Sequence, residues 1–341
     1  MPNYKHLYNM TDETGILQFS QYHHPDQDSG YTLDDNARAL MAALSMGDEG
    51  YPLALIFTRY LHRSWRENGK WSNLLLHGKY YHHLDSEDSF GRAFWACSTG
   101  SKSNWPIIAD SCLEMLELAV TKLPFLHSAR GMAYCLIGLC KGQFPFLTVQ
   151  YQNSLIRLLT DRLLSLYSSQ RSFDWNWFEN AMTYCNGILP HSLFVVHAYN
   201  GNKKCLQVAC ESIRFLNHHL FAKGYLNIVG NEGWYVRGGK MPEWDQQPVD
   251  AASIVFACHE AYQATGLKEY KHLMISAHHW YRGSNINSLP LYDIESGGCF
   301  DALTREGVNL NQGAEALLSL LLSDLLMAGY NADKLPQAQS L

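Results

Sequence analysis

The chain has 341 residues, of which 47% are hydrophobic and 17% are charged, and its formal net charge is −6 at pH 7. Lys and Arg are scattered along it, whereas a nucleic-acid-binding surface needs them clustered, so we expect no nucleic-acid partner. No uninterrupted apolar stretch reaches the roughly 18 residues that a membrane-spanning helix needs, so we expect no membrane partner either.

The N-terminal segment and the cysteines indicate where the protein resides. Residues 1–6 lack the apolar core of a signal peptide. The 9 Cys residues are odd in number, show no zinc-type CxxC spacing and lie mostly in apolar helical runs, as buried reduced thiols do. These features predict a cytoplasmic protein, or a periplasmic one if a signal peptide has been removed. GxGxxG, Walker and HExxH motifs are absent from the sequence, so we expect no cofactor and no metal.

Helical periodicity dominates the chain, and two kinds of predicted helix alternate along it. Helices of the first kind are apolar on almost every side and begin with a polar motif. Their expected starts are near Leu33, near Glu87, just after His127, and near Ala181, Pro248 and Asn311. Helices of the second kind are amphipathic. They are expected over residues 51–66, 105–122, 148–168, 203–219 and 267–281, with a short further helix within residues 2–11.

This alternation predicts an all-α fold, a six-hairpin α/α toroid or (α/α)6 barrel, as a single domain over residues 1–341. An open solenoid of helical hairpins is the alternative, but the variable repeat length and the six hairpins favour a closed ring. Residues 224–248 and 289–309 are rich in Gly, aromatic and β-forming residues, so we predict small β-hairpins or long loops there. Both segments precede a helix of the first kind, which would place them over one end of the ring.

Acidic residues gather at the starts of the predicted inner helices. Capping and the helix dipole explain any one of them. However, parallel inner helices would bring these acids together with amides and aromatic side chains, which favours a carbohydrate site. The candidate catalytic carboxyls are Asp34, Asp35, Glu179 and Asp245. The adjacent Asp34 and Asp35 repel each other, which raises the pKa of one of them and suits a general acid or base.

The structural alternative for this pair makes Asp34 a helix cap and Asp35 the ion-pair partner of Arg38 or Arg92. The candidate substrate-binding residues share either a place at these helix starts or a place in the loop ahead of the fifth inner helix. They are Asn36, Arg38, Glu87, Asp88, Arg92, Trp175, Trp177, Trp234, Tyr235, Arg237, Gln246, Gln247, Asp250, Asn311, Gln312 and Glu315. Amide and charged groups among them would bind sugar hydroxyls, and the aromatic rings would stack on sugar C–H faces.

Six phrases carry a resemblance to a known family: MTDETGILQFSQYHHPDQDSGYTLDDNARAL, GRAFWA, WNWFENAMTYCNGILPHSL, NEGWYVRGG, EWDQQPVDA and NQGAEALLSLLL. Together, from about residue 6 to residue 323, they resemble a bacterial family that is encoded near glycan-processing genes and also occurs as a domain following glycosyltransferase domains. The resemblance implies membership of the six-hairpin glycosidase group and an α/α toroid. It also implies a sugar site around Asp34, Asp35, Glu179 and Asp245, and a glycosyltransferase as a candidate partner.

Three functions remain open from the sequence. The leading hypothesis is a glycoside hydrolase that uses paired carboxyls on an oligosaccharide or a bacterial glycan, with mannose-containing glycans among the candidates. A second is a sugar epimerase, with His127, His191 and His259 as candidate acid–base residues, or a polysaccharide lyase. The third is a non-catalytic glycan-binding partner of a glycosyltransferase.

Overall fold

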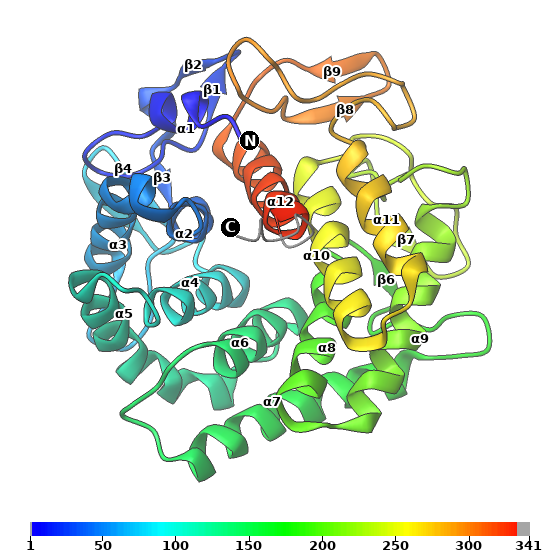
Figure 1. The fold of residues 1–341 in the computed structure, drawn as a ribbon, viewed down its shortest axis with the longest axis horizontal. Coiled ribbons are helices and arrows are strands. Elements are labelled where there is room, and N and C mark those ends of the chain that lie inside the picture. The colour runs from blue at the N-terminus through cyan, green and yellow to red at the C-terminus, as the bar shows by residue number, and fades with distance from the viewer. Residues whose placement is uncertain (1, 333–341) are drawn as a thin grey trace, which may run out of the picture.

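The computed structural model describes residues 2–332 and is built mainly of helices arranged in a ring (Figure 1). The α-helices are α1 (Lys5–Met10), α2 (Leu33–Leu44), α3 (Tyr51–Ser64), α4 (Glu87–Gly100), α5 (Pro106–Ala119), α6 (Ala129–Lys141), α7 (Val149–Gln170), α8 (Ile188–Asn200), α9 (Lys203–Leu220), α10 (Pro248–Thr265), α11 (Lys268–His279) and α12 (Ala314–Ala332). Short 3-10 helices cover Gln27–Ser29, Gly47–Gly50 and Val120–Phe125.

Every second helix belongs to an inner ring. α2 contacts α4, and the contacts continue through α6, α8 and α10 to α12, which contacts α2 and closes the ring. The helices α3, α5, α7, α9 and α11 pack outside α2, α4, α6, α8 and α10 respectively, and α1 packs on α12 (Figure 1). The predicted α/α toroid is therefore confirmed, and the open solenoid is wrong.

The inner helices are apolar on most sides because they contact helices on both flanks and behind them. In α6, residues 129–139 are all buried. Small residues allow the closest approach: a Cβ atom on Gly91 of α4 would lie 2.8 Å from the Gly131 carbonyl oxygen of α6. Within residues 2–332, no helix combines the length and apolar character that crossing a membrane requires.

The strands are short and lie in the loops. They are β1 (Ser20–Gln21), β2 (His24–Pro25), β3 (Tyr31–Thr32), β4 (Leu74–Leu76), β5 (Lys79–Tyr81), β6 (Ala181–Met182), β7 (Tyr235–Val236), β8 (Ala302–Thr304) and β9 (Gly307–Asn309). All pairs are antiparallel: β1 with β2, β3 with β4, β4 with β5, β6 with β7, and β8 with β9. The predicted insertions at residues 224–248 and 289–309 thus contain β7 and the β8–β9 hairpin.

Two inner helices begin later than predicted. Residues 181–182 form β6 instead of the first turn of α8, which starts at Ile188. The cause is a turn in which Cys185 has a φ of 45° and the Asn186 side chain accepts from Thr183 N at 3.1 Å. The α12 helix begins at Ala314 rather than Asn311.

Candidate functional site

The N-terminal ends of the inner helices meet at one face of the ring, as the sequence predicts. Hydroxyl groups cap three of them, since Thr32 accepts from Asp35 N at 3.2 Å, Ser86 from Ser89 N at 3.0 Å, and Ser128 from Gly131 N at 3.2 Å. The interpretation of Asp34 as the cap of α2 is therefore wrong. Because these hydroxyls cap the helices, the carboxyl groups in the first turns are available to bind other partners.

A pocket of about 430 Å³ lies at this face, which we call the mouth pocket. Residues of α2, α12, the start of α10 and the β8–β9 hairpin line it. Its carboxyl groups belong to Asp34, Asp35, Asp245, Asp301 and Glu315, and further lining residues include Arg38, Asn73, Gln247 and Asn309. Three of the four predicted catalytic carboxyls, all but Glu179, therefore line one pocket, together with Gln247, Arg38 and Glu315 from the predicted binding set.

Asp35 is the most constrained of these carboxyls. It is 4% exposed, and its two oxygens accept from the Thr32 hydroxyl at 2.6 Å and from Arg38 Nη1 at 2.9 Å. The Nη2 atom of Arg38 also donates to Glu315 Oε2 of α12, at 2.7 Å. Burial raises the pKa of Asp35 to about 6, against the lowering effect of Arg38. The predicted ion pair with Arg38 is thus present, and the geometry favours a positioning role for Asp35.

Asp34 faces the other neighbour of α2. Its Oδ1 atom lies 3.0 Å from Arg92 Nε of α4, and the Asp34 side chain is 26% exposed. Arg92 also contacts the Tyr134 ring, whose centroid is 4.6 Å from the guanidinium carbon. Arg92 thus pairs with Asp34 of the neighbouring helix, while Asp88, four residues before Arg92 on α4, accepts from Ser128 and Tyr184.

Asp301 is a pocket carboxyl that the sequence did not single out. It lies just before β8, within a segment that was predicted only to cover the ring, and its Oδ1 atom accepts from Gly313 N at 2.6 Å. Burial raises the pKa of Asp301 to about 6, and Glu315 adds to the shift. Burial and the nearby Glu232 also raise the pKa of Asp245. The pocket therefore holds carboxyls that can carry a proton near neutral pH.

Glu179 lies outside the mouth pocket, in contacts with α6. Its oxygens accept from Arg130 Nη1 at 2.9 and 3.1 Å, and its side chain is 33% exposed. Arg130 also donates to the carbonyl of Tyr184 at 2.6 Å and to the Thr183 hydroxyl at 2.6 Å. The sequence missed Arg130, which sits in an apolar helix without an acidic neighbour in the chain. Glu179 thus fixes the turn before α8 to α6, which does not support the predicted catalytic role.

The acids of α4 are also bound within the protein. Glu87 accepts from the backbone N–H groups of His127 and Ser128 at 2.6 and 2.5 Å. Asp88 accepts from the hydroxyls of Ser128 and Tyr184. These bonds join α4 to α6 and to the turn before α8, and Glu87 and Asp88 lie outside the mouth-pocket lining, so their predicted contacts with substrate stay a prediction.

Asp250 has a similar structural environment in α10. It is 4% exposed and accepts from Cys185 N at 2.6 Å. Burial raises the pKa of Asp250 to about 7, although the Cys185 hydrogen bond lowers it. Asp250 lies outside the mouth pocket, so the predicted contact with substrate is not supported.

Several amide side chains that the sequence predicts to bind substrate make hydrogen bonds within the protein. Asn36 is fully buried and accepts from Ile16 N at 3.0 Å. The fully buried Gln246 accepts from Trp280 Nε1 at 3.1 Å, and Gln312 donates to Asp293 at 3.0 Å. Asn311 accepts from Tyr22 N at 2.9 Å. Asn36 and Asn311 thus satisfy backbone N–H groups of loop residues, while Gln246 and Gln312 bind the side chains of Trp280 and Asp293.

The predicted aromatic contacts divide in the same way. Trp175 and Trp177 are buried among apolar side chains, so they are not available for stacking on sugar. Tyr235 packs against Trp175, with ring centroids 5.5 Å apart. Trp234 is 40% exposed, and Arg237 lies 3.5 Å from Asp174 at the surface. Of this group, Trp234 retains the exposed ring surface that a sugar contact needs.

The histidines proposed for an epimerase lie outside the mouth pocket. His191 is buried deeper in the ring, where it lines a cavity of about 70 Å³, and burial lowers the pKa of His191 to about 3. His259 is partly buried, with its pKa lowered by burial. His127 is exposed at the start of α6. No His belongs to the mouth-pocket lining within residues 2–332, and the same residues hold no cluster of three metal-ligating side chains.

Comparisons with known proteins support the ring architecture. No family model matches the chain, and no curated protein is similar to it in sequence. Among solved structures, a cellobiose 2-epimerase from Bacillus thermoamylovorans superposes with a TM-score of 0.73 at 10% identity, over 96% of each chain. The chain has the (α/α)6 toroid fold.

Enzymes with different activities share this fold. A D-mannose isomerase matches with a TM-score of 0.72 at 14% identity, over 95% of this chain and 94% of the isomerase. A GH76 α-mannanase from Bacteroides thetaiotaomicron matches with a TM-score of 0.61 at 12% identity, over 89% and 87% respectively. Such neighbours belong to the six-hairpin glycosidase superfamily, and at these identities the likeness extends to the fold alone.

Proposed function

We propose that the protein is a glycoside hydrolase and that the mouth pocket is its active site. The observation that carries this proposal is the convergence of Asp34, Asp245 and Asp301 on one pocket from three separate segments. Hydrolysis of a glycosidic bond generally needs one carboxyl as general acid and another as base or nucleophile. A pocket with carboxyls in different electrostatic environments meets that need.

We assign the general acid to Asp301. Its raised pKa of about 6 keeps it largely protonated in mildly acidic solution, so it can donate a proton to the leaving-group oxygen. The Gly313 N–H fixes one of its oxygens and leaves the other for the substrate. Its position before the β8–β9 hairpin places it at the rim formed by that insertion.

We assign the second carboxyl to Asp34. The guanidinium of Arg92 contacts one oxygen of the Asp34 carboxyl at 3.0 Å, an arrangement that suits a base or a nucleophile. Asp35 and Glu315 hold Arg38 in the wall of the pocket, where the three form a linked ion-pair network. Asp245 has no side-chain hydrogen bond within residues 2–332, so its oxygens are left to bind sugar hydroxyls.

Sugar release tests the proposal. Wild-type protein is incubated with a panel of neutral oligosaccharides and mannans, and reducing ends are measured beside Asp301→Asn and Glu306→Gln. The Glu306→Gln variant is the matched control, because Glu306 is an exposed acid in the same hairpin. We expect release by the wild type and the control, with loss in Asp301→Asn of about 100-fold or more. Equal release by all three proteins contradicts the assignment of Asp301.

A polysaccharide lyase and a non-catalytic glycan-binding partner of a glycosyltransferase give different results in the same assay. A lyase forms an unsaturated sugar that absorbs ultraviolet light, and a hydrolase does not. A binding protein retains sugar without releasing reducing ends. The mouth-pocket lining favours hydrolysis over the epimerase hypothesis, because the side chains in it that can act as an acid or a base near neutral pH are carboxyls, whereas the epimerase hypothesis requires histidine.

A further inference from the structure

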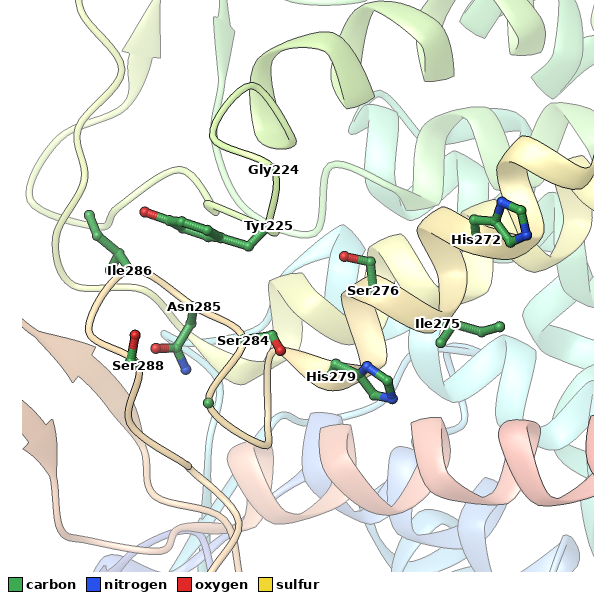
Figure 2. Close-up of a pocket in the computed structure, with 11 residues that line it drawn as sticks. Gly224, Tyr225, His272, Ile275, Ser276, His279, Ser284, Asn285, Ile286 and Ser288 are labelled. Carbon is green, nitrogen blue, oxygen red and sulfur yellow. The ribbon is translucent and has the colours of Figure 1, made fainter.

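A second pocket, of about 650 Å³, lies on the outer flank of the ring. Three segments surround it: one face of α11, residues 224–225 after α9, and the loop at residues 283–288 (Figure 2). We call it the flank pocket. It shares no lining residue with the mouth pocket, so the proposed hydrolysis does not account for it.

One wall of the flank pocket is a helical face with polar groups. His272, Ser276 and His279 are four and then three residues apart on α11, which places them on the same side of the helix. Figure 2 shows Tyr225 on a separate loop beside this helix, with its ring extending toward Ile286 of the 283–288 loop. The pocket is therefore lined by an aromatic ring from one segment and by imidazole and hydroxyl groups from another.

The lining combines apolar surface with hydroxyl, amide and imidazole groups. Tyr225, Ile275 and Ile286 are partly buried and supply the apolar surface. The hydroxyls of Ser276 and Ser288 have no hydrogen-bond partner within residues 2–332. No Asp, Glu, Lys or Arg belongs to the lining of this pocket in the described chain. The described lining thus offers a charged ligand no carboxylate, ammonium or guanidinium partner, whereas a sugar ring offers C–H faces for Tyr225 and hydroxyls for the polar groups.

The loop wall is fixed before any ligand binds. Asn285 is buried, and its side-chain amide donates to the carbonyls of Trp280 at 2.9 Å and Leu289 at 2.7 Å. Its oxygen accepts from Asn287 N at 3.2 Å. Trp280 Nε1 in turn donates to Gln246, one residue from the mouth-pocket residue Asp245. A preformed wall lowers the ordering cost of binding.

We infer that the flank pocket binds a neutral saccharide unit of a glycan, with Tyr225 as its stacking platform. This site goes beyond the proposed hydrolysis, because it lies outside the mouth pocket and needs no bond cleavage. A glycan held there remains tethered to the protein while another part of the same or a neighbouring chain enters the mouth pocket. The site would contribute most to long or insoluble glycans and least to short ones.

The experiment uses the full chain with Asp301→Asn, to prevent turnover, and three probes: cellohexaose, maltohexaose and α-1,6-mannohexaose. Imidazole ring signals of His272 and His279 are followed by NMR and assigned with His272→Gln and His279→Gln. We expect at least one hexasaccharide to shift both signals at concentrations up to about 10 mM, the weak end of specific binding. Absence of shifts with all three probes overturns the inference.

Variants at Tyr225 supply the second measurement. We expect Tyr225→Ala to weaken the binding that shifts the histidine signals by about three- to tenfold, and Tyr225→Phe to preserve it, because the ring is the contact. The matched control is Tyr151→Ala, which removes an exposed ring on α7 and should change nothing. Equal affinity for Tyr225→Ala and the Asp301→Asn parent overturns the inference. Histidine shifts without hydrolysis by the wild type would remove the proposed function and leave the flank site standing, and hydrolysis without shifts would do the reverse.

Discussion

Acidic side chains lie at or just before the starts of α2, α10 and α12, which form a first group, and at the start of α4 and in the segment before α8, which form a second group. The two groups use these acids differently. In the second group, Glu87 and Glu179 accept from backbone N–H groups or from Arg130 and join neighbouring helices. In the first group, Asp34 and Asp245 line the mouth pocket. An acid at a helix start is therefore a catalytic candidate only where the adjacent segments leave one of its carboxyl oxygens without a hydrogen-bond donor.

The largest expected effect comes from replacing one acid in each of the two groups with its amide and comparing the two variants. Asp34→Asn should lower kcat by about 100- to 10,000-fold, because it removes one carboxyl of the proposed pair. Glu87→Gln, in the first turn of the neighbouring helix α4, should keep kcat within about twofold. Steady-state kinetics on the glycan released in the hydrolysis assay measures both. Comparable losses of kcat in the two variants would contradict the functional distinction between the first and the second group.

Asp250 should produce the next largest effect, on the pH dependence of stability. Its pKa rises from the ordinary 3.8 to about 7 in the folded protein, so the folded state keeps a proton that the unfolded chain releases. This contribution is fully present below about pH 4 and is lost as the pH rises through 7. Wild-type stability should therefore fall between pH 4 and pH 7 by roughly 3 kcal/mol more than that of Asp250→Asn.

Urea unfolding of both proteins at several pH values measures this difference. Comparison with the variant is needed because other carboxyls, such as Asp293, have lowered pKa values and oppose the trend. Parallel stability curves for the wild type and Asp250→Asn would show that Asp250 titrates alike in the folded and unfolded chains.

A smaller effect is expected for the ion pair that holds the turn before α8. Glu179→Gln should lower the free energy of unfolding by about 2 kcal/mol, because it removes the charged partner of Arg130. The partial exposure of Glu179 and the remaining bonds of Arg130 to Thr183 and Tyr184 limit the loss. Thermal unfolding measures it, with the exposed Glu306→Gln as control. A stable variant without activity would instead return Glu179 to the catalytic candidates.

The fold could be predicted from the sequence because its signals are local and repeated. The apolar inner helices and amphipathic outer helices alternate as the residues suggest, and most boundaries agree within a few residues. The start of α8 was wrong because its apolar periodicity continues upstream of a turn. That turn depends on the positive φ of Cys185 and on the side-chain bonds of Asn186, which leave no mark in the periodicity.

The site was less predictable, because contacts between residues far apart in the sequence determine which acids line the pocket. Nothing in the sequence near Glu179 shows that Arg130, 49 residues earlier, binds it. Burial of Trp175 and Trp177 likewise follows from tertiary packing, since aromatic residues serve cores and sugar sites alike. Asp301 was not among the predicted catalytic residues, because it is a single acid in a predicted loop. Its one available signal was its place in an insertion predicted to cover the active end.

The smallest expected effect sharpens the comparison at a single pair of helix ends. Glu87→Gln should lower the free energy of unfolding by about 1 kcal/mol, because a neutral amide oxygen accepts less strongly than a carboxylate from the N–H groups of His127 and Ser128 at the positive end of α6. The loss should shrink at high salt, since part of it is charge–dipole attraction. Chemical unfolding at low and high ionic strength, beside Glu306→Gln, measures both. A loss of stability that does not depend on salt would show that Glu87 acts through side-chain packing. The acids of the second group would then stabilise the ring through packing more than through charge.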